Sequence, residues 1–137
     1  MGQNNSIQKI NFEDVKKSLN TTVLINTLNE TKQDCLIIGT IHARNETDFI
    51  NELIKKRNYN IPLILYGMNH SDDTIHKKYN QLVSLGFTNV YIYVGGLFEW
   101  LCLQDIYGDD EFPTTTKEPD LLQFRPSQYF IPKITNM

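Results

Sequence analysis

The chain of 137 residues has the composition of one ordinary globular domain, with 40% hydrophobic and 21% charged residues. A folded chain of this length buries about two-thirds of the surface that it exposes when unfolded, so one core forms without disulfides or metals. The 13 Lys and Arg and the 16 Asp and Glu give a net charge of -3, without a block of basic residues. This balance argues against nucleic acid as a partner.

The two cysteines and the hydropathy of the chain point to a cytoplasmic protein. Cys35 and Cys102 lie far apart, and neither forms a CxxC pair or stands beside a histidine at metal-ligand spacing. No apolar run approaches the length of a membrane span, and no hydrophobic signal peptide follows Met1. We therefore expect a cytoplasmic location, with no resident metal or other cofactor.

The first half of the chain predicts two helices and two strands. Residues 11–19 begin with a capping asparagine and place apolar side chains on one helical face. Two apolar, β-branched runs at 22–28 and 36–41 predict buried strands. Asn45 is the predicted N-cap of a second amphipathic helix, which ends in the basic residues 55–57.

The second half continues this alternation. Residues 62–66 form a short, fully apolar run that is typical of a strand covered on both faces. The pattern then predicts a helix capped by Ser71 and ended by Gly86, a strand at 90–94 and a helix at 97–103. Strands and helices at these intervals predict an α/β fold, with a small, mostly parallel sheet flanked by helices on both faces.

The two ends differ from this pattern. Residues 1–10 are predicted to form a flexible leader, and residues 105–137 a C-terminal extension that prolines break into short pieces. The extension is too apolar and aromatic for a free linker, so we expect it to wrap the domain surface or to dock on a partner. The acidic residues at 105–111 lack the ligand pattern of a calcium loop and are interpreted as a solvated turn.

One local signature resembles a known family. Residues 86–100, GFTNVYIYVGGLFEW, are similar to the closing strand, Gly-Gly turn and tryptophan-bearing helix of the rhodanese-like domain. Residues 24–28 and 63–66 match the positions of two of its central strands. The resemblance covers residues 11–104 and implies the same α/β architecture, with Trp100 in the core. The whole chain also resembles the single-domain rhodanese-like proteins encoded by large DNA viruses.

The resemblance also implies where an active site belongs. In active family members, the loop after the central strand begins with a nucleophilic cysteine and ends with an arginine, and its backbone N–H groups hold an anion. This chain has Gly67 at the position of the cysteine and Asp72 near that of the arginine, while Asn26 and Leu28 replace a usual Asp and Arg. The degenerate loop consists of Gly67, Met68, Asn69, His70, Ser71 and Asp72.

The residues of this loop argue against both sulfur transfer and phosphatase chemistry. Gly67 offers no thiolate, and two acids at the start of the following helix oppose an anionic substrate. His70 is a candidate general base or substitute nucleophile, weighed against a solvated loop histidine. Cys35 and Cys102 are candidate displaced thiols, but an inert, buried state is expected for both. The remaining histidines, His42 and His76, show no metal-ligand spacing.

The N-terminus carries a modification motif. Residues 1–6, MGQNNS, fit the N-myristoylation pattern, with Gly2 as the acylated residue and Ser6 at the hydroxyl position. One myristoyl chain gives only marginal membrane affinity, so stable attachment needs a second signal, for which Lys9 and Lys16–Lys17 are weak candidates.

The leading functional hypothesis is therefore a catalytically inactive rhodanese-like module that binds an unknown protein partner. Myristate on Gly2 would tether it to a membrane surface. One alternative is an atypical sulfurtransferase or phosphatase-like enzyme that uses His70 or a displaced thiol. The other is a structural component of a virion, so that the host cytoplasm and the virion are both expected locations.

Overall fold

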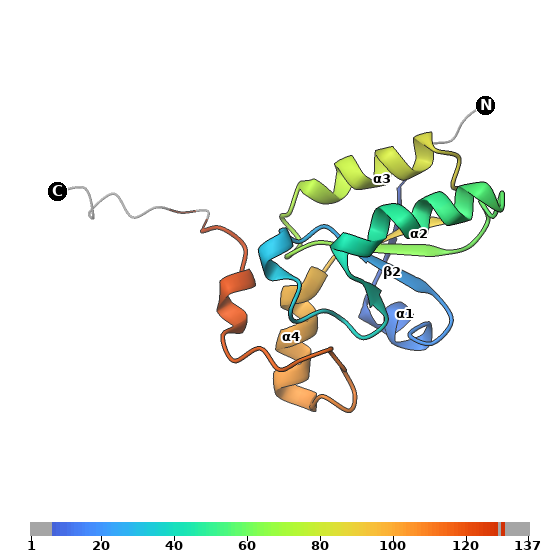
Figure 1. Ribbon diagram of the computed structural model, residues 1–137. Coiled ribbons are helices and arrows are strands. Elements are labelled where there is room, and N and C mark those ends of the chain that lie inside the picture. The colour runs from blue at the N-terminus through green and yellow to red at the C-terminus, as the bar shows by residue number, and fades with distance from the viewer. Residues whose placement is uncertain (1–6, 129, 131–137) are drawn as a thin grey trace.

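The computed structural model describes residues 7–128 and 130, and these fold around one parallel sheet (Figure 1). In chain order the elements are β1 (Gln8–Ile10), α1 (Phe12–Lys17), β2 (Val23–Asn26), the 3-10 helix η1 (Glu30–Lys32), β3 (Thr40–Ile41), α2 (Ala43–Lys55), β4 (Leu63–Tyr66), α3 (Thr74–Ser84), β5 (Val90–Tyr93), α4 (Gly96–Tyr107) and the 3-10 helix η2 (Leu121–Phe124).

The sheet has five strands in the order β1-β5-β4-β2-β3, and every neighbouring pair is parallel. All four residues of the central strand β4 are buried, as its uninterrupted apolar sequence predicts for a strand covered on both faces. In the register of the sheet, Ile64 of β4 lies between Leu24 of β2 and Tyr91 of β5. The predicted α/β class and parallel sheet are confirmed.

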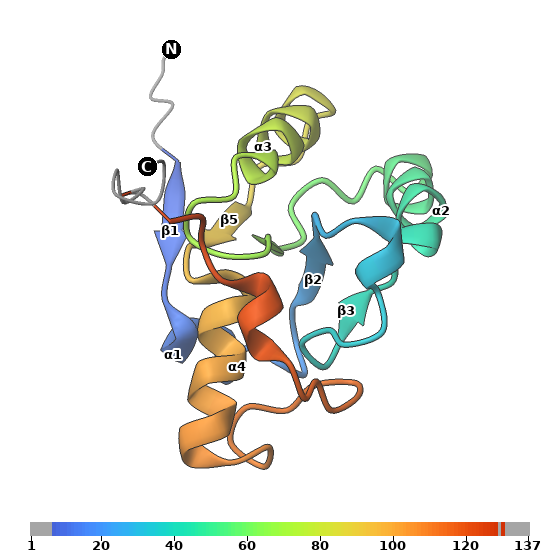
Figure 2. The same cartoon turned by 90° about the vertical axis from the view of Figure 1, so that its left-hand side faces the viewer.

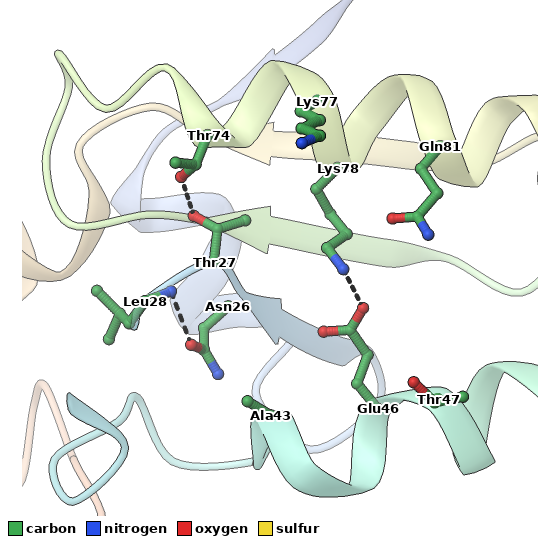
Figure 3. Close-up of a pocket in the computed structure, with 10 residues that line it drawn as sticks. All are labelled: Asn26, Thr27, Leu28, Ala43, Glu46, Thr47, Thr74, Lys77, Lys78 and Gln81. Atoms are coloured by element: carbon green, nitrogen blue, oxygen red, sulfur yellow. Dashed lines mark hydrogen bonds and ion pairs between the residues drawn. The ribbon is translucent and has the colours of Figure 1, made fainter. Parts of the chain in front are cut away.

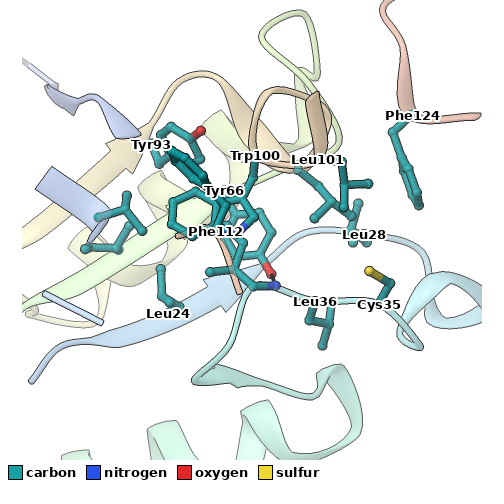
Figure 4. Close-up of a cluster of buried hydrophobic side chains, with 14 residues drawn as sticks. Leu24, Leu28, Cys35, Leu36, Tyr66, Tyr93, Trp100, Leu101, Phe112 and Phe124 are labelled. Atoms are coloured by element: carbon teal, nitrogen blue, oxygen red, sulfur yellow. Dashed lines mark hydrogen bonds between the residues drawn. The ribbon is translucent and has the colours of Figure 1, made fainter. Parts of the chain in front are cut away.

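Two cores lie on opposite faces of the sheet. Helices α2 and α3 cover one face, and α1, α4 and η2 cover the other (Figure 2). The second core is rich in aromatic side chains, with Tyr93 and Phe112 packed edge-on against Trp100 (Figure 4). Trp100 is fully buried, and its indole N–H donates to the carbonyl of Pro113. The predicted core role of this tryptophan is confirmed.

Several predicted boundaries are wrong. Helix α2 begins at Ala43 rather than after Asn45, because His42 is its N-cap and accepts the N–H of Arg44 at Nδ1. Helix α3 begins at Thr74, with Asp73 rather than Ser71 at the N-cap. The predicted strand at 36–41 is reduced to two residues, because the backbone at 36–38 pairs instead with residues 113–115 of the extension.

The folded region also begins earlier than residue 11. Gln8–Ile10 form β1, which pairs in parallel with β5 along the edge of the sheet. The predicted leader was therefore too long, because a three-residue strand carries too little apolar pattern to be seen in a sequence. Residues 1–6, with Gly2 and its acylation motif, lie outside the described residues.

The extension wraps the domain, which is one of the two interpretations that the sequence left open. Its first residues, 105–107, complete α4. Phe112 and Phe124 are then buried in the core beside α4, and Ile37 forms an antiparallel bridge with Thr114. Within the part of the chain that the structure describes, no helix is long and apolar enough to cross a bilayer.

Candidate functional site

The loop at residues 67–73 leaves the sheet at a point where the chain changes direction. After β2 the chain moves to β3 on one side, and after β4 it moves to β5 on the other. Parallel sheets bind ligands outside the carboxyl ends of two strands connected in this way. The loop that the sequence singled out therefore lies at the position where this topology favours a site.

The carboxylate of Asp72 lies inside this loop. Its Oδ2 accepts the backbone N–H of Met68 at 2.8 Å, and its Oδ1 accepts the N–H of Thr74 at 3.0 Å. The hydroxyl of Thr74 lies 2.6 Å from the same Oδ1. One carboxylate thus takes N–H groups from both ends of the loop, as a bound anion would.

Gly67 lies directly against this carboxylate. A Cβ atom built on Gly67 would be 2.6 Å from Oδ2 of Asp72 and 2.9 Å from Oγ1 of Thr27. Both separations are shorter than real Cβ contacts, so a side chain at position 67 and the observed position of Asp72 exclude each other. The loop from 67 to 73 holds neither a cysteine nor an arginine.

The Gly-Gly turn after β5 and the start of α4 hold the loop through backbone contacts. The N–H groups of Leu97 and Phe98, at the start of α4, donate to the carbonyls of Gly67 and Met68 at 2.9 Å each. Gly96 has a φ of 70°, and a Cβ there would lie 2.8 Å from the carbonyl oxygen of Gly67. The turn and the loop pack backbone against backbone, which only a glycine permits.

A family comparison agrees with this architecture. The family model of the Rhodanese-like domain matches residues 11–102. The chain belongs to the rhodanese-like family. The match includes all but the last two residues of the region, 11–104, that the sequence resemblance covered.

Two solved structures share this rhodanese-like fold. The Alr3790 protein from Anabaena sp. is 22% identical, with a TM-score of 0.55 over 83% of this chain and 97% of the other. The yeast protein Ygr203w, described as a protein tyrosine phosphatase of the Rhodanese family, is 14% identical, with a TM-score of 0.63 over 87% of this chain and 99% of its own. At these identities the similarity shows the fold alone. No curated protein matches the sequence.

The other residues of the rhodanese-like loop have structural partners or face solvent. Asn69 donates its side-chain amide to the carbonyl of Phe124 and accepts the N–H of Ser71, so it joins the loop to the extension. His70 is exposed, and its ring contacts only the hydroxyl of Ser71, at 3.3 Å, among the described residues. Among the described residues, no carboxylate bonds to this ring to orient it as a base.

Asn26, which replaces the family's usual Asp, is part of the fold rather than of the loop. It is 3% exposed, and its amide exchanges two hydrogen bonds with the amide of Gln33. Its Oδ1 also accepts the N–H of Leu28 at 3.0 Å. The pair fixes the chain after β2, and the sequence gives no sign of Gln33 because a buried glutamine lacks a periodic pattern.

The surroundings of the two thiols disfavour the thiolate form. Burial raises the pKa of Cys35, whose Sγ contacts the carbonyl oxygen of Thr116 at 3.3 Å. Burial and the nearby carboxylates of Asp105 and Glu99 raise the pKa of Cys102. Cys35 is buried as predicted. Cys102 is partly exposed, because it lies on α4 at the border between the face that packs on the sheet and the face toward solvent.

The remaining candidates form no metal centre among the described residues, where no group of three metal-ligating side chains meets. His42 caps α2 and His76 is exposed on α3. In the acidic turn, Glu111 pairs with Lys16 at 2.8 Å, and this ion pair lowers the pKa of the Glu111 carboxyl.

The structure also contains a cleft that sequence reasoning missed. It has a volume of about 370 Å³ and lies between α2 and α3, beside the carboxyl end of β2 (Figure 3). Its lining residues come from three segments that are distant in sequence, so no local motif announces it. They are Asn26, Thr27, Leu28, Ala43, Glu46, Thr47, Thr74, Lys77, Lys78 and Gln81.

Proposed function

We propose that this rhodanese-like chain is catalytically inactive and acts by binding another protein. The observation that carries the proposal is the carboxylate of Asp72, which takes the N–H groups of Met68 and Thr74 inside the loop, against Gly67. The N–H groups that a persulfide or an oxyanion substrate would need are already occupied by a group of the same charge. A substrate would have to expel Asp72 and would find no thiol at position 67.

Electrostatics supports the same proposal. An anionic donor approaching the loop meets Asp72 and the neighbouring Asp73 at the start of α3. Loop residues 67–73 contain no cation, and Lys9 of β1, which lines the same small pocket, offers one positive charge against these two. A nucleophilic thiolate also needs positive surroundings, whereas the pKa values of both thiols are raised.

Activity assays on the purified full chain test this proposal. We expect no thiocyanate from thiosulfate and cyanide, and no hydrolysis of an aryl phosphate, above a heat-treated control. Activity that His70→Ala or Cys102→Ser abolishes would overturn the proposal and establish the alternative, an atypical sulfurtransferase or phosphatase-like enzyme. A transferred sulfur or phosphoryl group found on either side chain by mass spectrometry would have the same meaning.

A second proposal concerns location. We propose that Gly2 is myristoylated and that the chain, like the viral proteins that it resembles, acts in the cytoplasm of a host cell. The support is the MGQNNS motif, which lies outside the described residues. Co-expression with a myristoyltransferase should add the mass of one myristoyl group to the chain and none to Gly2→Ala. An unmodified wild-type chain in that experiment would remove the membrane tether.

The virion-structural alternative makes a separate prediction about abundance. A packaged component should be enriched in purified particles relative to the infected-cell lysate. A chain that acts by binding during replication should instead be found in the lysate and be depleted from particles.

A further inference from the structure

The cleft between α2 and α3 has the features of a ligand site that is distinct from the loop. Its volume of about 370 Å³ lies within the range of small-molecule sites, roughly 300–1,000 Å³. It is open, and hydroxyl, amide and charged side chains make up most of its lining, unlike the mainly apolar lining of sites for drug-sized ligands. These features favour a hydrated, charged ligand.

The charge of the cleft selects an anion. Its ionisable residues are two cations, Lys77 and Lys78, and one anion, Glu46. Lys78 reaches from α3 to form an ion pair with Glu46 on α2, as Figure 3 shows. Lys77 has no ion pair or hydrogen bond among the described residues. The cleft therefore keeps one unneutralised positive charge on a protein whose net charge is -3.

Neutral groups around this charge can complete the recognition of a carboxylate. Gln81 extends from α3 toward α2, and Thr47 of α2 lies on the opposite side (Figure 3). Neither side chain makes a hydrogen bond among the described residues, so their donors are available to a ligand. At the other end, the hydroxyl of Thr74 donates to the hydroxyl oxygen of Thr27 at 2.8 Å, and this pair closes the cleft toward the loop.

The length of the cleft fits a peptide segment better than a single ion. From Thr74 to Gln81 the lining follows α3 for about 10 Å at 1.5 Å per residue. That distance corresponds to roughly three residues of an extended chain. The two helices form the walls of a groove that is open to solvent along this length.

We propose that this cleft binds an acidic peptide segment of a partner protein, with a Glu or Asp carboxylate paired to Lys77. The ion pair of Lys78 and Glu46 sets the specificity, because Glu46 repels a second carboxylate that is placed close to α2. This inference rests on the proposed function in taking the ligand to be a partner rather than a substrate.

Fluorescence anisotropy with a labelled hexaglutamate peptide and the full chain tests the proposal. Saturable binding at low ionic strength should weaken with added salt, and hexaglutamine should not bind. Lys77→Glu should weaken binding by roughly fivefold or more, because it replaces an attractive charge by a repulsive one. Glu46→Gln should tighten binding, because it frees the charge of Lys78.

Matched controls separate the cleft from general electrostatics. Lys17→Glu changes the same charge on α1, which lies on the opposite face of the sheet, and should leave binding unchanged. In an NMR titration, the amide signals of Thr47, Thr74 and Gln81 should shift with added peptide. Equal weakening by Lys17→Glu, no binding by the wild type, or equal affinity for free glutamate or inorganic phosphate would each overturn the proposal.

The two proposals fail separately. Absent peptide binding leaves the expected inactivity of the loop untouched, since that is read from thiosulfate and aryl phosphate assays. Conversely, sulfur transfer by the wild type would contradict the proposed function. The loss of peptide affinity in Lys77→Glu could still be measured in that case.

Discussion

The carboxylate of Asp72 occupies the space beside Gly67 in which a side chain at position 67 would begin. A Cβ on Gly67 would lie 2.6 Å from Oδ2 of Asp72, and the same oxygen accepts the N–H of Met68 at 2.8 Å. The two positions have opposite properties, since one lacks a side chain and the other supplies a charged group. Together they place a carboxylate of the chain itself on the N–H groups of Met68 and Thr74.

The first prediction concerns the stability that Asp72 provides. Asp72→Ala removes the acceptor of the Met68 and Thr74 N–H groups and should lower the free energy of unfolding by about 1–2 kcal/mol, as for a lost helix cap. Asp73 makes no side-chain capping bond, so Asp73→Ala should change stability by less than about 0.5 kcal/mol. Urea denaturation measures the free energy of unfolding of both variants. An equally small loss in both would show that the hydrogen bonds of Asp72 add no stability.

A double-mutant cycle tests the exclusion between positions 67 and 72. Gly67 is not among the glycines with positive φ, so Gly67→Ala meets no backbone strain and should cost about 1–3 kcal/mol through the clash alone. The same substitution in an Asp72→Ala background should cost about 1 kcal/mol less. Additive effects would mean that Asp72 leaves the loop freely and does not block position 67.

Comparison of these residues with the sequence shows what a pattern can reveal. The apolar run of β4 and the apolar stripe of α2 follow from burial, which recurs at regular intervals along a strand or helix. These elements and the sheet were therefore predictable from the sequence. Through the family resemblance, Gly67 and Asp72 were also recognisable as departures from the usual loop. The sequence did not show that Asp72 turns into the loop, because two N–H groups that are brought together only by folding hold it there.

The error at the start of α3 has a physical cause that propensity does not contain. Ser71, Asp72 and Asp73 are all good capping residues, so propensity alone cannot choose among them. The choice is made by the loop, which is fixed at Gly67 and Met68 by hydrogen bonds from α4. The cleft was hidden for a similar reason, since Glu46 and Lys78 lie 32 positions apart and meet only across two helices.

The third prediction concerns the close approach of the Gly-Gly turn to the loop. Gly96→Ala places a Cβ 2.8–2.9 Å from backbone atoms of Gly67 and Asn69 in a residue with φ of 70°, so neither partner can rotate away. We expect a loss of more than about 2 kcal/mol, from backbone strain of about 1–2 kcal/mol plus the clash. Gly108 has a φ of 102° but open space around it, so Gly108→Ala should show the strain alone. Thermal denaturation compares the two variants, and equal losses would contradict the packing argument.

The fourth prediction concerns thiol reactivity and its dependence on pH. Both cysteines have a pKa above the ordinary value of 9.0, so their thiolate fraction is small at neutral pH. Iodoacetamide should label the partly exposed Cys102 slowly, at a rate that still rises with pH above 9, and should label Cys35 only after unfolding. Mass spectrometry of the wild type and of Cys102→Ser assigns each label. Rapid labelling of either thiol at pH 7 would reopen the case for a displaced nucleophile.

The same shifts fix the sign of a stability change. A thiol whose pKa is higher in the folded state than in the unfolded state stabilises the fold below pH 9, and this contribution is lost as pH rises through the folded pKa. Stability should therefore fall in alkali, and the fall should be smaller in Cys35→Ser. Urea denaturation at several alkaline pH values tests this, and an unchanged fall in the variant would assign it to other groups.

The last prediction tests whether the extension is part of the folded domain. Phe124 is 2% exposed in the aromatic core, and its carbonyl accepts the amide of Asn69 from the loop. Phe124→Ala should therefore destabilise the fold by about 3–5 kcal/mol, the usual cost of emptying a buried phenylalanine site. Leu122 lies in the same short helix but is 55% exposed, so Leu122→Ala should change stability by less than about 0.5 kcal/mol. Chemical denaturation gives both values. Similar small effects would mean that the extension leaves the domain readily and that its apolar residues are free to contact a partner.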